Sequence, residues 1–595
     1  MSLNTINDIF YSAVERNSPR VMAYKQTVKW IDISSRELYR DTVGVSRALE
    51  SWGIGKGDRV AILSENRPEW AVADFGTLLI GGVVVPIYPT LTAEQTAFIL
   101  KDSGARVIFL STAQQLKKFL TIKDQTSVEK AVIMDYVGIT EAVPMHRLLH
   151  GGPAGRDTEF DAHAHNIQPD DLASIIYTSG TTGSFKGVMI SHGNMASNIR
   201  HSLDGFPIGE KDLGISFLPL AHVTARHVDY AWIYRGVAIA YCPVLEKLPE
   251  VMQELHPTVL VGVPRVWEKI HAQVLQKTAS GLSNQIYLWA MKVGRAHRQQ
   301  FLADKQPTSL SWKLADLLVF SKVRKGLGGR AKILLSGGAP LGRPLAEWFA
   351  DMGVRIDEGY GLTETSPIIA VNSPAAHKLG TVGRPLVNVE VRIAEDGEIL
   401  VRGPSIFKGY WNLPQQTAEA FAEGGWFKTG DIGGIDSEGF LAVTDRKKDL
   451  LKTSGGKFIT PQPIERSIQL NPLVGAVVVL ADRRKFPSAI IGPNFALLEE
   501  WARGRNVSFK TREELVGHPH VYLLYEKIVA EVNENLARFE QIKKFLLIAD
   551  EFSIANGTLT PSMKLRRRQV EEIYRERIEA LYLEVDSEPA RAVAE

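Results

Sequence analysis

Residues 178–187 combine hydroxyl side chains, glycines and one lysine in the stretch "TSGTTGSFKG". Backbone N–H groups of a glycine-rich turn can converge on one anion, hydroxyls add neutral donors, and Lys186 adds a positive charge. This set suits a polyphosphate better than a single carboxylate. The order differs from the Walker P-loop, because Phe185 precedes the lysine and Gly187 follows it. The alternative is a flexible surface loop, which fits less well where a strand (173–179, "ASIIYTS") leads into the loop and a helix is expected after Ser191.

A second group of chemically suited residues lies in "DEGYGLTETS", residues 357–366. A tyrosine between glycines, Tyr360, can stack on a planar base. Thr363 can donate to a phosphate, and Glu364 is a hard oxygen ligand suited to Mg²⁺. An acidic helix start without any ligand is the alternative interpretation.

Two later stretches add charged groups. Asp431 in "GWFKTGDIG" and Arg446 in "TDRKKDLLKTSGGK" are a carboxylate and a guanidinium that could grip a ribose diol. Lys564 follows a proline-containing turn in "NGTLTPSMKLRRR".

The elements that must position these residues follow an alternating pattern near the N-terminus. Short apolar runs at 57–64, 83–89 and 105–111 predict strands, and the stretches 67–82 and 92–104 between them predict helices. Such alternation indicates a parallel sheet covered by helices. The same order recurs with a strand at 331–336 and a helix at 342–353.

The pattern then changes to a β-rich region. "VNVEVRIAEDGEILVRG" (387–403) alternates apolar and polar residues around Asp396 and Gly397, which predicts a hairpin with a type I′ turn. After residue 446 we expect a new unit with a helix at 461–470, a strand at 474–482 and a long helix from Val521 to about Arg538.

The sequence therefore predicts an α/β fold: a large N-terminal domain of helix-covered, mostly parallel sheets plus a β-rich subdomain, and a smaller, mobile α+β C-terminal domain. We place the domains at 1–445 and 446–585, with a disordered tail at 586–595.

Composition narrows the function classes. A net charge of +2 over 595 residues gives no sign of nucleic-acid binding. Cys242 is the only cysteine, which excludes an intramolecular disulfide and cysteine-based metal sites, and its apolar surroundings predict a buried side chain. We find no signal peptide and no apolar stretch of the ~20 residues that a membrane span needs, so we expect a cytoplasmic protein.

Taken together, the motifs resemble those of the adenylate-forming enzymes, which include acyl-CoA synthetases, adenylation domains of nonribosomal peptide synthetases and firefly luciferase. The matching stretches, in order, are "YTSGTTGSFKG", "SGGAPL", "DEGYGLTET", "KTGDIG", "DRKKDLLKTSGGK" and "LTPSMKLRR". Two more, "FLPLAHV" (217–223) and "VGVPRVWEKI" (261–270), are similar to the long-chain fatty acyl-CoA synthetase branch.

The resemblance implies three sets of site residues. The ATP site would comprise Thr178, Ser179, Gly180, Thr181, Thr182, Gly183, Lys186, Gly338, Ala339, Pro340, Glu358, Gly359, Tyr360, Gly361, Thr363, Asp431, Arg446, Lys448 and Lys564. The acyl site would comprise His222, Gly262, Val263, Trp267 and Gly337, with Trp267 at the gate of a fatty-acid tunnel. Catalysis would depend on Lys186, Thr363, Glu364 and Lys564, with Glu364 holding Mg²⁺.

The resemblance further implies a two-step ligase reaction. ATP and a fatty acid would give an acyl-adenylate and pyrophosphate, and CoA would then take the acyl group while the C-terminal domain rotates about a hinge at Lys448. A lipid substrate also allows peripheral contact with the inner face of a membrane, and a homodimer is compatible with the family. The alternatives are an acyl-AMP ligase that loads a carrier protein, a P-loop kinase or ATPase, and a non-catalytic binding protein.

Two positions depart from the family pattern. Phe185 stands where relatives usually have proline, which predicts a more mobile or differently packed loop. Ala225 stands where long-chain relatives often have an acidic residue, which leaves any role of that acid near the acyl or CoA pocket unfilled.

Overall fold

The computed structural model describes residues 3–135, 138, 141–149, 151–179, 185–447, 450–455, 457–553, 556–559 and 565–586. It divides into two compact units. The larger contains Met1–Trp267, Thr278–Thr429 and Ile435–Ala442, and the smaller contains Glu268–Lys277, Gly430–Gly434 and Val443–Glu595.

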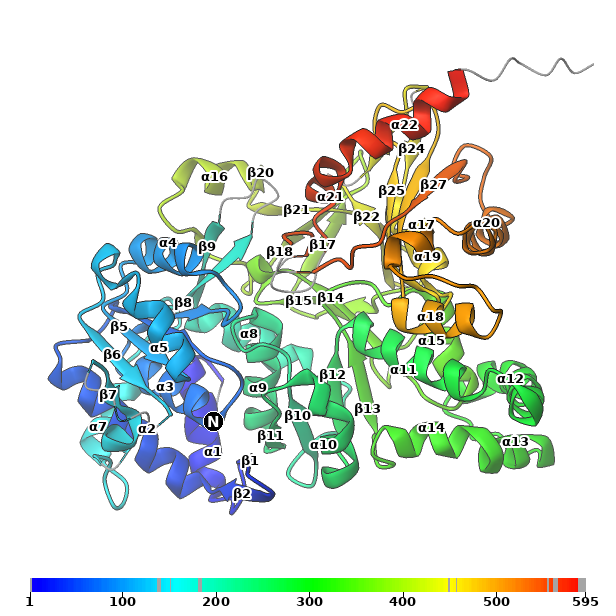
Figure 1. Ribbon diagram of the computed structural model, residues 1–595. Helices are drawn as coiled ribbons and strands as arrows, with labels where there is room; N and C mark the ends of the chain where they lie inside the picture. Colours follow the sequence, from blue (N-terminus) through cyan, green and yellow to red (C-terminus); the bar gives the residue numbers. More distant parts are fainter. Residues whose placement is uncertain are drawn as a thin grey trace, which may run out of the picture. The chain divides into compact units, whose positions relative to one another are not determined.

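The alternating elements near the N-terminus lie in an eight-stranded sheet of order β19-β9-β8-β4-β3-β5-β6-β7 (Figure 1). Its outer strands are β6 (Lys130–Ile133) and β7 (Val143–Pro144) on one side and β8 (Leu172–Ser179), β9 (Phe185–Ser191) and β19 (Gly409–Tyr410) on the other. Its parallel centre contains β3 (Arg59–Leu63), β4 (Val83–Ile87) and β5 (Val107–Leu110). The crossovers are α3 (Pro68–Leu78) and α4 (Ala93–Ser103), as the sequence predicts. Every residue of β4 is buried, which agrees with the continuous apolar run from which it was predicted.

Helix α4 begins and ends where its sequence provides caps. Thr92 and Gln95 form a capping box, in which each side chain accepts a hydrogen bond from the other residue's backbone N–H. Gly104 ends the helix in the left-handed conformation, with φ of 64°. The helix thus closes the crossover between two parallel strands with its terminal backbone groups satisfied.

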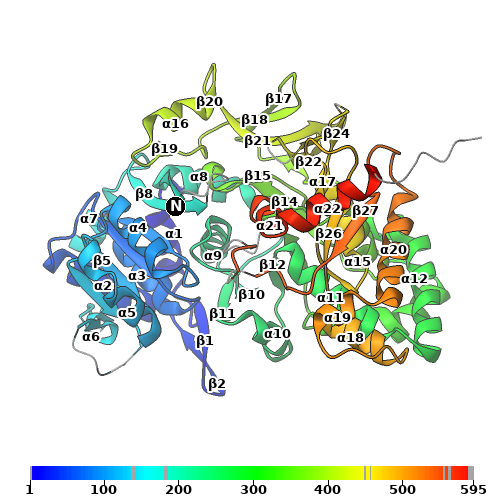
Figure 2. The ribbon, with the colours of Figure 1, turned by 45° about the horizontal axis from the view of Figure 1, so that its top comes forward.

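A nine-stranded sheet of order β16-β15-β14-β13-β12-β10-β11-β1-β2 forms the second sheet of the larger unit (Figure 2). Its outer strands are β15 (Ile368–Val371) and β16 (Arg384–Pro385) at one end and β1 (Met22–Gln26) and β2 (Lys29–Ile33) at the other. Neighbouring strands are parallel from β11 to β14; these are β11 (Ala238–Tyr241), β10 (Leu213–Ser216), β12 (Val259–Gly262), β13 (Ile333–Ser336) and β14 (Asp357–Gly361). Helix α15 (Arg343–Asp351) follows β13, so the strand and helix predicted at this point are confirmed. The carboxyl ends of β12, β13 and β14 meet at one edge, which gathers three of the predicted motifs.

The β-rich region contains the predicted hairpin, made of β17 (Glu390–Ile393) and β18 (Glu398–Arg402). The predicted type I′ turn is wrong. A type I′ turn needs positive φ at both central residues, whereas Gly397 has φ of 83° and Asp396 is not among the positive-φ residues. Four residues connect the strands, and the N–H of Ala394 donates to Glu398 O across the base of that loop.

The smaller unit is built on a three-stranded sheet of order β25-β26-β27, comprising β25 (Val474–Leu480), β26 (Ser488–Pro493) and β27 (Lys544–Leu547). Helix α17 (Pro461–Gln469) and strand β25 appear where they were predicted. The predicted long helix is α20 (Pro519–Asn533), which ends earlier than expected. The Asn533 side chain exchanges hydrogen bonds with the backbone of Ile542, at 2.9 Å each, and so fixes the reversal of the chain after the helix.

The predicted α/β class with parallel sheets, helices and a β-rich part is confirmed. Cys242 is buried, as expected. No helix among the described residues is long and apolar enough to cross a membrane. The predicted disordered tail lies outside the described residues, apart from Asp586 at the end of α22 (Arg575–Asp586).

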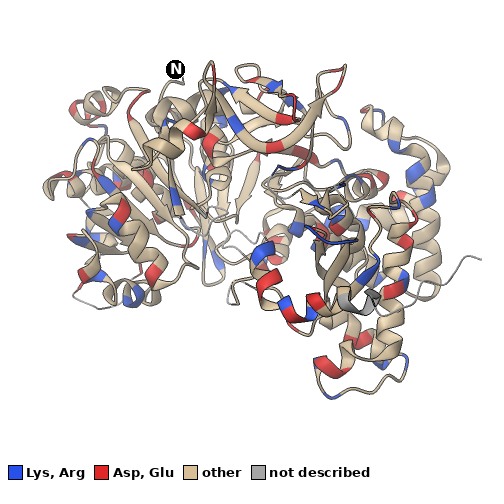
Figure 3. Cartoon of the chain, turned by 90° about the horizontal axis from the view of Figure 1, so that it is seen from above, with Lys and Arg blue, Asp and Glu red and all other residues tan. Residues whose placement is uncertain are grey.

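Acidic and basic residues are interspersed over most elements of the structure (Figure 3). This distribution agrees with the small net charge.

Candidate active site

The phosphate-loop motif lies between two antiparallel strands, β8 (Leu172–Ser179) and β9 (Phe185–Ser191). Thr178 is opposite Lys186 in the register, so the hydroxyl and the ammonium leave the same end of the strand pair. The helix expected after Ser191 is confirmed, but a strand that was not predicted stands between the loop and this helix. Strand β9 comes first, and α8 (His192–Ser202) then begins at the N-cap Ser191. The predicted residues Gly180, Thr181, Thr182 and Gly183 lie outside the described residues.

Phe185 has a packing role in this arrangement. Its ring lies 6.1 Å from the ring of Phe98, centroid to centroid, on helix α4. The side chain also packs on the core beneath the eight-stranded sheet. The first described residue after the loop is therefore held by ring packing.

The stretches "SGGAPL" and "DEGYGLTET" lie side by side at the carboxyl edge of the nine-stranded sheet. The buried side chain of Glu358, on β14, accepts a hydrogen bond from the N–H of Leu341 at 3.0 Å. The N–H of Gly337 donates to Gly262 O at 3.1 Å. Gly338 has φ of 78°, a conformation that favours glycine. The loop containing Gly338, Ala339 and Pro340 is thus fixed at both ends beside the end of β14, where Gly359 and the half-buried Tyr360 lie.

The turn that carries Thr363 and Glu364 is held rigidly from below. A Cβ on Gly361 would lie 1.8 Å from Pro367 O, so only glycine fits there. The Asn198 side chain, fully buried on α8, donates to Ile368 O at 2.7 Å and accepts from Ile368 N–H at 3.2 Å. The short 3₁₀ turn Thr363–Thr365 is therefore positioned by a helix that starts at the end of β9.

Tyr410 brings Lys186 and Glu364 together. Its hydroxyl donates to Glu364 Oε1 at 2.9 Å, and Lys186 Nζ lies 5.0 Å from the centre of its ring. Burial, and then the neighbouring Glu364 carboxylate, raise the pKa of Tyr410 above its ordinary value, so the hydroxyl stays a donor at neutral pH. The sequence reasoning missed this residue. The glycine–aromatic stretch "KGYWN" was the signal that could have found it.

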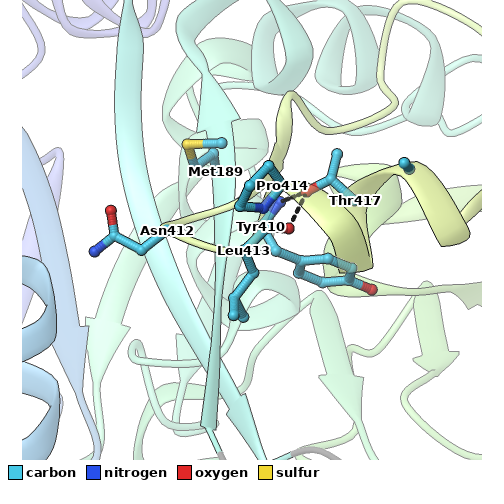
Figure 4. A pocket seen from close by; sticks show the side chains of 7 residues that line it. Met189, Tyr410, Asn412, Leu413, Pro414 and Thr417 are labelled. Atoms are coloured by element: carbon cyan, nitrogen blue, oxygen red, sulfur yellow. Dashed lines mark hydrogen bonds between the residues drawn. The ribbon is translucent and has the colours of Figure 1, made fainter.

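The backbone of Tyr410 is fixed by strand pairing. Strand β19 (Gly409–Tyr410) is antiparallel to β9, and the Tyr410 N–H donates to Thr417 Oγ1 at 2.9 Å. Figure 4 shows this bond, with the phenol ring extending away from it. The same residues line an open hollow of about 440 Å³ together with Met189, Leu413 and Pro414. The strand that carries Lys186 thus also sets the position of the tyrosine ring.

The described residues could hold a magnesium ion only if substrate phosphates supplied some of its ligands. Among them, no group of three or more His, Cys, Asp or Glu side chains could hold a metal. Glu364 is a single half-buried carboxylate, with Oε1 bonded to Tyr410. Mg²⁺ is usually bound by one or two carboxylates, water and substrate phosphates, so one glutamate beside a phosphate loop is sufficient.

The predicted acyl-site residues lie at or after the carboxyl ends of three strands: His222 follows β10, Gly262, Val263 and Trp267 end or follow β12, and Gly337 follows β13. His222 is the N-cap of α9 (Val223–Arg235), and its Nδ1 accepts the Thr224 N–H at 3.1 Å. Gly262 ends β12, and a Cβ there would lie 3.3 Å from the indole of Trp267. Trp267 is fully buried against Phe349, with ring centroids 5.9 Å apart. Its indole N–H has no hydrogen-bond partner among the described residues.

Comparison with known proteins places the chain in a family. Residues 10–411 match the profile of the AMP-binding enzyme, and residues 448–586 match that of the AMP-binding enzyme C-terminal domain. The chain belongs to the AMP-binding enzyme family. The predicted resemblance is therefore confirmed.

Individual relatives of this AMP-binding enzyme cover nearly its whole length. The chain is 35% identical over 585 residues to "Long-chain-fatty-acid--CoA ligase FadD15" of Mycobacterium bovis, covering 96% of this chain and 95% of the relative. It is 31% identical over 619 residues to "Long-chain-fatty-acid--CoA ligase ACSBG1" of Mus musculus, covering 98% and 86%. Both alignments run through both units.

Solved structures share the fold at lower identity. ATP-bound MatB from Rhodopseudomonas palustris has a TM-score of 0.71 at 23% identity, covering 97% of this chain and 99% of that one. The anthranilate CoA ligase AuaEII, in complex with anthranoyl-AMP, has a TM-score of 0.72 at 19% identity, covering 96% and 98%.

The smaller unit of the AMP-binding enzyme holds the predicted ribose pair. Arg446 Nε lies 3.3 Å from Asp431 Oδ1, and Asp431 is buried while Arg446 is exposed. The pair comes from β21 (Trp426–Ile435) and β22 (Leu441–Arg446), which are neighbours in one sheet. Lys448 and Lys564 lie outside the described residues.

A buried polar network begins next to Ala225 on helix α9. Ala225 is buried, and the next residue, Arg226, forms a buried ion pair with Asp74 and donates to Ser174 Oγ at 2.7 Å. Asp229, one helical turn on, accepts from Ser216 Oγ at 3.0 Å, and burial raises its pKa to about 7. Helix α9 is thus anchored through Arg226 and Asp229, two residues that sequence reasoning missed.

Proposed function

We propose that this enzyme joins a fatty acid to CoA with ATP, forming AMP and pyrophosphate. The observation that carries the proposal is the meeting of Lys186 and Glu364 on Tyr410, because it sets a phosphate-binding cation beside the carboxylate suited to Mg²⁺. The relatives named as long-chain-fatty-acid–CoA ligases support fatty acid and CoA as the other two substrates.

The first step makes an acyl-adenylate. A carboxylate oxygen of the fatty acid attacks the α-phosphorus of ATP, a phosphorus–oxygen bond forms, and the bond from that phosphorus to the bridging oxygen breaks. Pyrophosphate leaves with the electron pair. The protein supplies position and charge rather than a covalent nucleophile. Lys186 would neutralise the leaving pyrophosphate, and Thr363 would donate to the α-phosphate.

The adenine and the ribose of ATP would each contact a separate group of residues. Gly338, Ala339 and Pro340, with Gly359, Tyr360 and Gly361, would line the base, since this loop is fixed to Glu358 through the Leu341 N–H. Asp431 and Arg446 would bind the ribose hydroxyls. Mg²⁺, bound at Glu364 and the phosphates, would offset the negative charge that opposes attack by a carboxylate.

The second step transfers the acyl group. The CoA thiolate attacks the acyl carbon, the carbon–sulfur bond forms, and AMP leaves with the electrons of the carbon–oxygen bond. In this proposal the smaller unit turns about Lys448 between the two steps, so that Lys564 serves only the first. The acyl chain would pass Trp267, and the lipid substrate would be taken up in peripheral contact with a membrane.

Separate assays of the two half-reactions test these roles. Lys564→Ala should abolish pyrophosphate release from ATP and a fatty acid, yet spare CoA thioester formation from supplied acyl-AMP. Equal loss in both assays would show that the role given to Lys564 is wrong. Replacing CoA by a phosphopantetheinylated carrier protein in the second assay distinguishes the ligase from one that loads a carrier.

A further inference from the structure

One segment of the larger unit departs from the even charge distribution. Residues 281–330 contain nine Lys and Arg, two Asp and no Glu, which gives +7 in a chain whose net charge is +2. Both acids are paired, Asp304 with Arg355 at 2.8 Å and Asp316 with Arg324 at 2.6 Å. Two of the bases are also paired, Arg324 with Asp316 and Arg298 with Glu347 and Asp351, so the positive field comes from the other seven.

The second half of this segment forms one helical run. It comprises α13 (Leu310–Ala315), the π-helical η3 (Asp316–Phe320) and α14 (Ser321–Gly326), joined through Asp316 and Ser321, which keep right-handed helical angles. Trp312 and Phe320 on its inner side are buried, with ring centroids 5.1 Å apart. The run is thus anchored on one side by an aromatic core.

The outer side of the run is apolar as well. Leu310 is 83% exposed, Leu314 47% and Leu317 69%, at spacings of four and three that place them on one helical face. A helix packed on its inner side normally turns polar residues to solvent. Scattered exposed leucines are common, but six of the 17 large apolar side chains that are exposed in the described chain fall within residues 282–317.

The remaining three exposed side chains belong to α12 (Gly281–Leu302), which packs on α13. They are Leu282, Leu288 and Trp289. The ring of His297 on α12 lies 5.6 Å from that of Trp312, centroid to centroid, at a tilt of 54°, and His297 shares a hydrogen bond with Ser309, so the two helices are one structural unit.

Lysines accompany the leucines. Lys313, Lys322 and Lys325 are exposed, and none forms an ion pair with any other residue in the described ranges. Exposed leucines beside unpaired lysines match the two parts of an anionic bilayer: its acyl region and its negatively charged headgroups. We define these three leucines and three lysines as the leucine–lysine face.

We propose that the leucine–lysine face binds the surface of an anionic lipid bilayer. The leucines enter the interface between headgroups and acyl chains, and the lysines contact lipid phosphates. That this face serves the uptake of fatty acid at the membrane rests on the proposed function. Binding of the face to lipid can be measured without any substrate.

The test is co-sedimentation of the full-length protein with vesicles. We expect binding to phosphatidylcholine vesicles containing about a third phosphatidylglycerol, weaker binding at high salt, and little binding to phosphatidylcholine alone. The triple variant Lys313→Glu/Lys322→Glu/Lys325→Glu should lower the partition coefficient about 100-fold. The variant Leu310→Ser/Leu314→Ser/Leu317→Ser should lower it at least about 10-fold.

Matched controls separate the face from net charge and from misfolding. Lys29→Glu/Lys117→Glu/Lys123→Glu makes the same change in net charge at exposed positions elsewhere and should retain binding within about 3-fold. Both face variants should melt as the wild type does and release pyrophosphate normally with a water-soluble medium-chain acid. Should the leucine variant not fold, the lysine variant decides, because its side chains have no ion-pair partner among the described residues.

Several results would overturn the proposal. These are a wild-type protein that does not sediment with anionic vesicles, face variants that bind like the wild type, and a control that loses binding equally. Light scattering that finds a wild-type dimer converted to monomer by the leucine variant would identify the face as a contact between two copies instead. Vesicle binding by a protein that makes no acyl-CoA would refute the proposed function and leave this inference standing.

Discussion

Removing the Tyr410 hydroxyl should slow adenylate formation while leaving the fold intact. Tyr410→Phe deletes only the group that donates to Glu364 Oε1 at 2.9 Å. The ring remains, so Lys186 keeps its position 5.0 Å from the ring centre. The substitution thus removes the hydrogen bond to Glu364 and leaves the contact between the ring and Lys186.

The size of the effect follows from the type of bond. A hydrogen bond to a charged group contributes about 1.5–3 kcal/mol. If Glu364 must hold its position in the transition state, this loss lowers the rate of pyrophosphate release roughly 10- to 100-fold, because about 1.4 kcal/mol corresponds to a factor of ten. Tyr410→Leu also removes the ring beneath Lys186 and should lose about 0.5–2 kcal/mol more.

Pyrophosphate release at saturating ATP and fatty acid measures this step, and a magnesium titration shows whether the apparent Mg²⁺ affinity falls in parallel. Tyr11→Phe is the matched control. Its hydroxyl also donates to a carboxylate, Asp161, at 2.9 Å, but it lies outside the candidate site. That variant should lose stability and keep its rate. The reasoning is refuted if Tyr410→Phe releases pyrophosphate within about twofold of the wild type, or if both tyrosine variants slow the reaction alike.

Three further substitutions test other parts of the account. Gly361→Ala puts a Cβ 1.8 Å from Pro367 O, so the turn must shift; we expect a loss of roughly 1–3 kcal/mol in stability and of adenylation activity, measured by melting and pyrophosphate release. Asp229→Asn tests the buried carboxyl whose pKa is raised to about 7. The pKa of Asp229 is higher in the folded than in the unfolded protein, so its contribution to the free energy of unfolding falls as the pH rises toward 7, by about 2 kcal/mol from pH 5.5. The variant lacks this titration, so its melting temperature should rise relative to that of the wild type over the same range. A melting-temperature difference that does not change with pH would contradict this. Arg446→Ala should raise the KM for ATP about 10-fold with a smaller change in kcat, since it removes one partner of the ribose pair, and an unchanged KM would argue against that role.

The sequence predicts those elements whose residues carry local signals. Helix α4 has its capping box and terminal glycine within the chain segment itself, and β4 is a continuous apolar run. Strand β9 was missed because a glycine and a lysine interrupt its apolar pattern, and its place is set by pairing with β8. The turn after β17 was misjudged because Asp-Gly suggests a two-residue loop, whereas four residues separate the end of β17 from the start of β18.

In the candidate site too, residues within local motifs were predicted and residues placed by tertiary packing were not. The motifs around Lys186 and Glu364 were recognised from their own residue types. Tyr410 was not, since it lies 46 residues from Glu364 and meets it only because β19 pairs with β9. Arg226 and Asp229 were missed for a related reason: within a helical stretch they look like ordinary surface charges, and only the packing of α9 buries them.

Identification of the nucleotide product tests the central claim most directly. The purified enzyme is supplied with ATP, Mg²⁺, CoA and a long-chain fatty acid, and the nucleotides and the acyl product are separated and quantified. We predict one AMP, one pyrophosphate and one acyl-CoA for each ATP consumed, with no turnover when the fatty acid is omitted. ADP and inorganic phosphate as the products, or ATP consumption that does not depend on the fatty acid, would contradict the account.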